Sequence, residues 1–451
     1  MSTFAEQLAE RAAALRAESL PAAARVVCED LLLDIAGLCV AARRSDYVGA
    51  LKASLDAGGP CTALGHPDGF SPEDAAMLNG TAAHGEDFDD TFEGGPVHSG
   101  AVVVPAVLAA CERFGRGGAD ALLGIATGVE AMCRLSLVAP KRIHKAGFHP
   151  TAVLGALAAT LGASRAMGLD PRQTVNALGI AGSMAGGIIE YLAEGAWTKR
   201  LHAGWAAHCG VHAARLGARG FTGPRTVLEG THGLFFAFAH GKEGDYDSLL
   251  DGFGERWHLA DITFKPYATG TMNQPYIDCA LRLAKQGFSA EEVVQVECET
   301  AEGYVHRLWE PLAAKQRPAN GYAAKFSTPY NVAVAFVTGA AGFEAFSDRA
   351  AADPRVLALA AKVRYRVDPA NPYPRAYTGH VRMTLADGRV FEERQPHIRG
   401  GKHEPLSREE IARKFRGNAA YGGWSAAQAD EFLAYAMSAY DGPVRLEPFR
   451  R

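Results

Sequence analysis

Residues 78–100 read LNGTAAHGEDFDDTFEGGPVHSG and are followed by an apolar, helix-like run, AVVVPAVLAACERFG. The stretch holds two histidines, His84 and His98. Five acidic residues lie between them: Glu86, Asp87, Asp89, Asp90 and Glu93. Ionisable groups between apolar segments are costly to bury unless they pair or take part in chemistry. Taken alone, the stretch fits either a solvated acidic loop or one part of a functional site.

The composition is that of an ordinary soluble globular protein, with 451 residues, 48% hydrophobic residues and a net charge of −4. This length favours two domains. No basic stripe and no run of ~18 apolar residues is found, so neither nucleic acid nor a membrane is an expected partner. Eight scattered cysteines without a CxxC motif predict reduced thiols in a cytoplasmic protein. The amphipathic N-terminus predicts no signal peptide.

Apolar residues recur every three or four positions through most of residues 4–265, which predicts an all-helical region. Helices are expected over residues 4–17 and from Ser71, a good N-cap residue, to about His84. Residues 177–192, ALGIAGSMAGGIIEYL, bring glycine and alanine close together in sequence. No βαβ context precedes them, so we expect close helix packing and not a nucleotide loop.

The pattern changes after Lys265. Residues 291–301, EEVVQVECETA, alternate like a strand, and residues 379–395 form two alternating runs around an Asp-Gly pair, a β-hairpin signal. The sequence therefore predicts a mainly α fold. A large all-helical domain (1–265 and 403–451) carries a smaller inserted α+β lid domain (266–402). Ligand sites favour the cleft between two such domains.

Two further stretches place basic residues near helix starts. In KRIHKAGFHPTAVLGALAA (141–159), His149 precedes an apolar helix whose N-terminus favours an anion. In EGAWTKRLHAGWAAHCGVHAARLGARGFTGP (194–224), Lys199 stands beside a stretch of apolar residues, a setting that suits carboxylate binding. His208 and His212 share one helix face there and could bind zinc. The sequence shows neither a third ligand nor an HExxH motif.

Histidines, lysines and aspartates without a metal motif or a nucleotide loop favour cofactor-free acid–base chemistry on an anionic substrate. Tyr330 in FSTPYNVAVAF (326–336) fits either a proton donor or a core residue. Two other classes stay open. One is a metal-dependent hydrolase that uses His84, Asp87, Asp90 and His98. The other is a protein that binds a ligand or partner without catalysis.

Seven ordered motifs resemble the MmgE/PrpD family over about residues 5–420: NGTAAHGEDFDDT, PVHSGAVVVPA, GFHPTAVLGA, KRLHAGWAA, RGFTGPRTVLEG, KPY and AKFSTPYNVAVA. This family includes 2-methylcitrate dehydratase, cis-aconitate decarboxylase and iminodisuccinate epimerase. The resemblance implies a helical domain with a smaller α+β lid domain, a homodimer and no cofactor, and the residues themselves predict no metal site. It also implies a small anionic carboxylate as substrate.

Carried over motif by motif, the resemblance implies an active site of Asp87, Thr91, His98, His149, Lys199, Lys265 and Tyr330. It implies His98 and His149 as acid/base or substrate-binding groups, and the two lysines as carboxylate anchors. Asp87 is expected to orient a neighbouring imidazole or lysine. His202 and Tyr267 join Thr91 as expected substrate-binding residues. Glu86, Asp89 and Glu93 are expected at the surface, and His84 fits either a helix end or a supporting partner.

The leading prediction is a cofactor-independent lyase of the dehydratase type, which removes a proton next to a carboxylate of a small di- or tricarboxylate. An epimerase, racemase or other isomerase, or a decarboxylase on a related dicarboxylate, is the alternative. Many members of the family carry a histidine shortly after KPY, but residues 268–278, ATGTMNQPYID, have none. That departure favours epimerisation, because reprotonation without a leaving group needs fewer acids.

Overall fold

A computed structural model describes residues 2–451 of the protein. The chain divides into two compact units. Unit 1 comprises the residues up to Gly85, Asp89–Ile262 and Arg408–Arg451, and unit 2 comprises Glu86–Phe88 and Thr263–Ser407. The mainly α class is confirmed. The three residues Glu86–Phe88, which the sequence-based boundaries left in the helical domain, are part of unit 2.

Unit 1 is built from long helices, as the sequence predicts, together with short strands that the periodicity did not indicate. The first helix ends at Ala14, earlier than expected. The helices are α1 (Phe4–Ala14), α2 (Ala22–Ala42), α3 (Asp46–Ala53), α4 (Pro72–His84), α5 (Gly100–Phe114), α6 (Gly118–Val138), α7 (Arg142–Lys145), α8 (Pro150–Met167), α9 (Pro171–Met184), α10 (Tyr191–Glu194), α11 (Thr198–Ala218), α12 (Leu234–Ala239), α13 (Asp247–Leu250), α20 (Arg408–Tyr421) and α21 (Ala426–Ala436). The strands are β1 (Cys61–Thr62), β2 (Gly69–Phe70) and β3 (Thr91–Phe92), and β4 (Ile262–Thr263) lies where the chain passes into unit 2.

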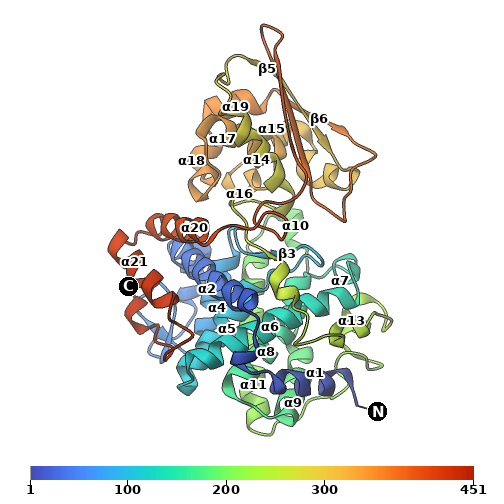
Figure 1. Ribbon diagram of the computed structural model, residues 1–451, viewed down its shortest axis with the longest axis vertical. Coiled ribbons are helices and arrows are strands. Elements are labelled where there is room, and N and C mark those ends of the chain that lie inside the picture. Colours follow the sequence, from blue (N-terminus) through green and yellow to red (C-terminus); the bar gives the residue numbers. More distant parts are fainter. Residues whose placement is uncertain (1) are drawn as a thin grey trace. The chain divides into compact units, whose positions relative to one another are not determined.

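The centre of unit 1 is helix α11, which packs against α8, α4, α9 and α5. Glycines make this packing close. A Cβ on Gly204 of α11 would lie 2.2 Å from the Met77 carbonyl oxygen, and a Cβ on Gly80 of α4 would lie 2.9 Å from the Gly204 Cα. This approach brings the C-terminal half of α4, which ends at His84, against the first turns of α11. Helix α20, which follows unit 2 in the chain, packs against α2, so segments from both ends of the sequence meet in unit 1 (Figure 1).

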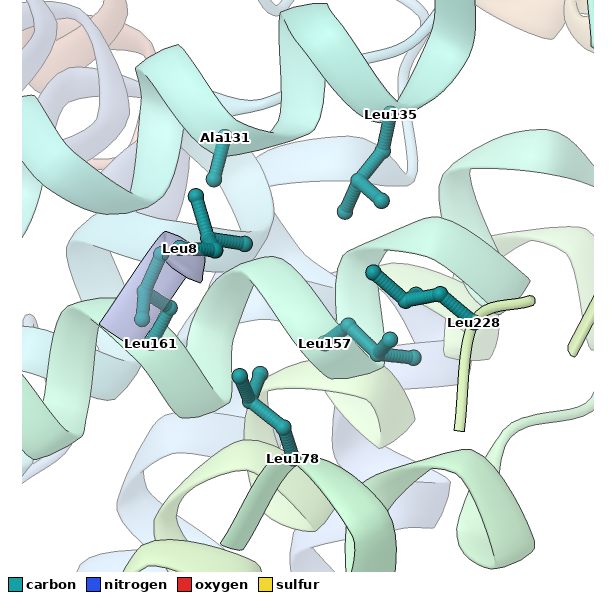
Figure 2. Close-up of a pocket in the computed structure, with 7 residues that line it drawn as sticks. All are labelled: Leu8, Ala131, Leu135, Leu157, Leu161, Leu178 and Leu228. Carbon is teal, nitrogen blue, oxygen red and sulfur yellow. The ribbon is translucent and has the colours of Figure 1, made fainter. Parts of the chain in front are cut away.

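Part of the interior of unit 1 is lined by aliphatic side chains alone. A small gap there is lined by Leu8, Ala131, Leu135, Leu157, Leu161, Leu178 and Leu228, from α1, α6, α8, α9 and the loop before α12 (Figure 2). With no polar lining, it is a packing seam that offers no chemistry.

Helix α6 is long and apolar enough to cross a membrane by length and composition, contrary to our expectation that no segment is. However, 94% of its apolar window is buried within the fold. Its Glu130 and Arg134 form a buried ion pair at 2.5 Å. This is the pattern of a core helix.

Unit 2 contains a four-stranded sheet in the order β6-β5-β7-β8. The strands are β5 (Val293–Thr300), β6 (Val363–Val367), β7 (Gly379–Leu385) and β8 (Val390–Gln395). Strands β5 and β6 are parallel, and the predicted Asp-Gly hairpin joins antiparallel β7 and β8. The helices are α14 (Gln274–Leu283), α15 (Leu312–Gln316), α16 (Gly321–Ala324), α17 (Thr328–Thr338), α18 (Asp348–Ala351) and α19 (Pro354–Ala360). Helix α14 packs against β7, β8 and α17.

Candidate active site

The acidic loop after α4 supplies a carboxylate to two histidines. Asp89, expected at the surface, has a side chain that is 0% exposed. Its Oδ2 lies 2.7 Å from Nδ1 of His84, and its Oδ1 lies 3.5 Å from Nδ1 of His98. The surface prediction for Asp89 is therefore wrong. The reason is that its charge is paired inside the fold.

The side chain of Asp90 contacts the start of the next helix, and its main chain contacts a histidine ring. Its carboxylate accepts hydrogen bonds from the main-chain N–H groups of Ser99 and Gly100 at the start of α5, and from the Ser99 hydroxyl. Its main-chain oxygen lies 2.7 Å from Nδ1 of His98. Burial and the neighbouring Asp89 raise the pKa of Asp90 to about 7, while the donors from Gly100 and Ser99 act to lower it. Asp90 thus joins the loop to α5 and fixes the His98 ring.

His149 is the N-cap residue of α8, with Pro150 at the first position of the helix, as the sequence predicts. Its Nδ1 lies 3.2 Å from Nδ1 of His202, which comes from the first turns of α11. Both side chains are buried, with 7% and 8% of the residue exposed. The main-chain N–H of His98 donates to the hydroxyl of Thr151, one residue after the Pro150 start of α8.

These four imidazoles form one group, which we call the histidine cluster: His84, His98, His149 and His202. The His84 ring centroid lies 4.9 Å from that of His98 and 5.6 Å from that of His149, and the His149 and His202 centroids are 5.3 Å apart. Tyr191 of α10 presents its ring edge-on to His149 and His202. Residues far apart in sequence are thus brought together within unit 1.

Two rings of the histidine cluster, His149 and His202, are held in the neutral form. Burial lowers the pKa of His149 well below its ordinary value, and the nearby His84 and Lys199 lower it further. Burial, followed by His84 and Lys199, lowers the pKa of His202 to about 4. At neutral pH both rings are therefore unprotonated, and a neutral imidazole can accept a proton. Lys199 lies in the first turn of α11 and is half-buried.

Four residues of the predicted site, Asp87, Lys265, Tyr267 and Tyr330, belong to unit 2, where two buried lysines hold the loop Glu86–Phe88. Nζ of Lys265 donates to the Asp87 main-chain oxygen at 3.0 Å. Nζ of Lys325 donates to the Glu86 main-chain oxygen at 2.8 Å and lies 3.2 Å from the Glu86 carboxylate. Asp87 has a φ of 55°, a left-handed conformation that costs a non-glycine residue free energy. The Tyr322 hydroxyl lies 3.3 Å from its carboxylate. Asp87 thus contacts a lysine through its main chain.

Three further predicted residues, Tyr330, Tyr267 and Thr91, are buried outside the histidine cluster. The Tyr330 hydroxyl donates to the Ala345 main-chain oxygen at 2.8 Å and the residue is 0% exposed, as expected of a core residue. The Tyr267 hydroxyl donates to Asp278 at 2.5 Å, and burial raises its pKa. Thr91 is buried in β3, with 1% exposed.

The residues that could hold a metal ion in the structure differ from those predicted from the sequence. Ligand atoms of His84, Asp89 and His98 lie within 4.8 Å of one another. Two histidines and a carboxylate could hold a zinc ion with one open position. The predicted set had Asp87 and Asp90 in place of Asp89. The carboxylate of Asp90 is already taken by the start of α5.

Sequence reasoning did not assign roles to Asp89, Lys325 and Tyr322, and it left His84 undecided. A local signal existed for Lys325, which stands within the motif AKFSTPY. None existed for Asp89, because its neighbours in sequence are equally acidic and only the fold distinguishes it.

Two family descriptions match the chain. The MmgE/PrpD N-terminal domain matches residues 6–247, and the MmgE/PrpD C-terminal domain matches residues 267–436. The chain belongs to the MmgE/PrpD family. The predicted resemblance is thereby confirmed, and with it the prediction of an enzyme of the lyase type found in this family.

The chain is similar to several relatives. Cis-aconitate decarboxylase of Mus musculus is 31% identical over 374 residues, which cover 79% of this chain and 74% of the relative. The Homo sapiens cis-aconitate decarboxylase is 31% identical over 381 residues, 79% and 75% of the two chains. The 2-methylcitrate dehydratase of Cupriavidus necator is 28% identical over 183 residues, which cover 34% of this chain and 37% of the relative.

Proposed function

We propose that this enzyme is a cofactor-independent lyase that acts on a small tricarboxylate by proton transfer at a carbon next to a carboxylate. The observation that carries the proposal is the histidine cluster. It places a buried neutral imidazole, His149, among rings that are linked to the Asp89 carboxylate. Such a set can remove a proton and return one without a metal or an organic cofactor.

The proposed roles follow from the surroundings of each group. In dehydration His149 accepts the C–H proton and His98 delivers one to the leaving hydroxyl; in decarboxylation His98, or His149 once protonated, gives the carbanion its proton. Lys199 adds positive charge near His149 and His202, which suits a substrate carboxylate and the negative charge that forms on the carbon acid. Lys265 and Thr91 remain proposed substrate-binding residues, whereas the Tyr267 hydroxyl already donates to Asp278 inside unit 2. Tyr330 is left out because its hydroxyl is used inside the core of unit 2.

Decarboxylation and dehydration both fit this machinery. In decarboxylation the bond to a carboxylate breaks, carbon dioxide leaves, and the carbanion takes a proton from an imidazolium. In dehydration a base removes a C–H proton, and the hydroxyl leaves as water with a proton from an acid. The cis-aconitate decarboxylases cover far more of this chain than the dehydratase does, and this favours decarboxylation over our first choice.

The test is a substrate panel in deuterated water, followed by NMR. Cis-aconitate, 2-methylcitrate and an aspartate-derived dicarboxylate are each incubated with the purified enzyme. Loss of carbon dioxide with deuterium gained at one carbon supports decarboxylation, and water loss supports dehydration. Deuterium uptake without a change of skeleton supports epimerisation. The same assay after extensive chelation is expected to give full activity, whereas activity that returns only with added zinc contradicts cofactor independence.

We also propose a homodimer. The segment from the end of α9 to α12 exposes several large apolar side chains. Monomeric soluble proteins rarely expose so many together. The exposed residues are Ile188, Leu192, Trp197, Trp205, Phe221 and Phe236. A second copy of the chain would cover them. Light scattering of the full chain is expected to give twice the monomer mass, and Trp197→Glu is expected to shift it toward the monomer.

A further inference from the structure

Two buried oxygen atoms on helix α14 have no hydrogen-bond partner among residues 2–451. They are Oε1 of Gln274 and Oδ2 of Asp278, and the two residues are 0% and 4% exposed. The residues are one helical turn apart, so their side chains lie on the same face of α14. Folded proteins leave few buried polar atoms unpaired, because each one has given up its hydrogen bond to water. Two such atoms on one helix face therefore point to a shared partner.

The orientation of the Gln274 amide is fixed by its nitrogen. Nε2 of Gln274 donates to the main-chain oxygens of Tyr267 and Thr269, each at 3.0 Å. Main-chain oxygens only accept hydrogen bonds, so the nitrogen and not the oxygen of the amide must face them. Oε1 is thus a buried acceptor that needs a donor.

Asp278 has a hydrogen-bond partner on one of its two oxygens. Its Oδ1 accepts from the Tyr267 hydroxyl at 2.5 Å, whereas its Oδ2 is unpaired. An ionised carboxylate can only accept, so it cannot pair with Oε1 of Gln274. A carboxylic acid carries one O–H group, and a proton on Oδ2 lets Asp278 donate to Gln274. One proton therefore gives both unpaired atoms a partner and leaves the contact with Tyr267 in place.

Both side chains hold the loop that carries Lys265, which we call the KPY loop (Lys265–Thr269). Gln274 binds the main chain of this loop at two points, and Asp278 binds the Tyr267 side chain. Lys265 stands at the start of the loop, and its Nζ donates to the Asp87 main-chain oxygen at 3.0 Å. The conformation of the KPY loop therefore helps to determine where the Lys265 ammonium group lies.

We propose that Asp278 is a positioning residue that holds the KPY loop as a neutral carboxylic acid, accepting from Tyr267 and donating to Gln274. The proposal rests on the proposed function, in which Lys265 binds a substrate carboxylate, and deepens it. Asp278 acts on the substrate only through the position of Lys265. The KPY tyrosine thereby has a supporting role inside unit 2.

The charges near Asp278 act in both directions. Burial raises the pKa of Asp278 to about 6, while Tyr267, Arg399 and Arg282 act to lower it and Glu404 acts to raise it. Arg282 is paired with Glu393 of β8 at 2.8 Å. The other titratable groups of β7, β8 and α17, against which α14 packs, are His380, Arg382, Glu392, Arg394 and Tyr330.

The sign of the pH dependence follows from the raised pKa. The folded protein binds the Asp278 proton more tightly than the unfolded chain, in which the pKa has its ordinary value of 3.8. The contribution of this group to stability is therefore present at low pH and lost as the pH rises through about 6. The KPY loop loses the contact between Asp278 and Gln274 over the same range.

The experiment compares the wild type with Asp278→Asn and Asp278→Leu in the full chain. Asparagine can accept from Tyr267 and donate to Gln274 at every pH, whereas leucine can do neither. Thermal unfolding is followed without substrate from about pH 5 to about pH 8. As the pH rises, we expect the Tm of the wild type to fall by about 2–4 °C relative to D278N. The infrared C=O band of a protonated carboxyl group is expected in the wild type at the lower pH and is expected to be missing from D278N.

Steady-state kinetics test the link to Lys265, with the carboxylate that the substrate panel identifies. Ionisation of the substrate affects all variants equally, so the ratio of KM values at each pH isolates Asp278. We expect D278L to raise KM by about three- to tenfold, with kcat changed by less than about twofold. We expect D278N to match the wild type in KM at the lower pH and to have the smaller KM at the higher pH.

The two parts of the proposal fail separately. Parallel unfolding curves for the wild type and D278N, or the same infrared spectrum from both, would overturn the neutral acid. A KM for D278L equal to that of the wild type would overturn the positioning role. If no variant and no wild-type protein turns over any carboxylate, the proposed function is refuted, and the unfolding curves and the infrared band still decide the state of Asp278.

If D278L does not fold, Gln274→Met takes its place. Methionine keeps the length of the side chain and removes the two donors to the KPY loop. We expect the same rise in KM. The matched control is Tyr330→Phe, which removes a different buried hydroxyl of unit 2 and should leave KM unchanged. An unchanged KM in Q274M, or an equal rise in both variants, would equally overturn the positioning role.

Discussion

The histidine cluster of unit 1 and the lysine-held loop of unit 2 are both buried and charged, yet they are built differently. In the cluster, ring nitrogens meet a carboxylate or another imidazole, and one of them, Nε2 of His84, has no partner among residues 2–451. In the loop, Lys265 and Lys325 donate to main-chain oxygens of Glu86–Phe88. The first arrangement leaves proton sites to be used, and the second uses lysines to fix a conformation.

This difference separates two kinds of perturbation. A change at His149 or His202 should alter proton transfer while the fold survives, because these neutral rings can be replaced by neutral amides. A change at the lysines should alter stability first, because it removes a donor from main-chain oxygens of the loop and a cation from beside the Glu86 carboxylate.

The largest expected effect is that of His149→Gln. The glutamine keeps a polar N-cap but cannot take up a proton, so kcat should fall by about 1000-fold at neutral pH. Thermal stability should stay near that of the wild type, because the replaced ring is neutral there. Steady-state kinetics and a melting curve measure both.

The matched control is His212→Gln, a histidine of α11 outside the cluster whose Nδ1 lies 3.3 Å from Glu73. It should retain activity. If both variants lose activity equally, the assignment of the proton acceptor is wrong.

His202→Gln tests the electrostatics of the two neutral rings, His149 and His202, through stability. The folded-state pKa of His202 is about 4 against an ordinary 6.5, so the unfolded chain binds the extra proton first as pH falls. The free energy of unfolding therefore decreases by about 3 kcal/mol through this group as the pH falls from 6.5 to 4. Asp30 and Asp90, whose pKa values burial raises to about 7, contribute with the opposite sign.

Comparing the pH dependence of stability in H202Q and the wild type isolates the contribution of His202. Urea unfolding at several pH values should show that H202Q loses less stability on acidification. Parallel curves for the two proteins would contradict the lowered pKa.

Lys265→Met and Lys325→Met separate binding from loop support. Both remove a donor to the loop Glu86–Phe88, and K325M also leaves the Glu86 carboxylate without its cation, at a cost of about 3 kcal/mol. If Lys265 anchors a substrate carboxylate, K265M should raise KM by about tenfold, a loss of about 1.4 kcal/mol. K325M should lower the melting temperature with KM near wild type. Equal KM values in the two variants would remove Lys265 from the binding residues.

Tyr330→Phe should have the smallest effect. It deletes one buried hydroxyl that donates to the Ala345 main-chain oxygen, at a cost of about 1 kcal/mol of stability. Activity under conditions where the variant is folded should match the wild type. A loss of kcat greater than tenfold would restore Tyr330 as a proton donor.

Much of the architecture follows from local sequence. The N-cap Ser71, the helix from Pro72 to His84 and the Asp-Gly hairpin between β7 and β8 could be predicted, because capping and turn chemistry act over a few residues. Two-residue strands such as β1 could not, since their pairing is set by the surrounding packing.

The histidines and the lysine of the candidate site could be predicted from the sequence, because few other residue types can perform their chemistry. His98, His149, Lys199 and His202 stand in motifs beside helix starts, and the structure brings the three histidines into one cluster. Asp89 could not be distinguished from its acidic neighbours by sequence. Its role depends on which side chain the turn after His84 directs inward, and that is a property of the packed loop.

The most direct test of the central claim is the deuterium content of the product formed in deuterated water by wild type, H149Q and H212Q. The wild type and H212Q should turn over a small tricarboxylate with one deuterium gained at a single carbon. H149Q should give no labelled product above background over the same period. Equal labelling by H149Q and wild type would show that proton transfer next to the carboxylate does not depend on the histidine cluster.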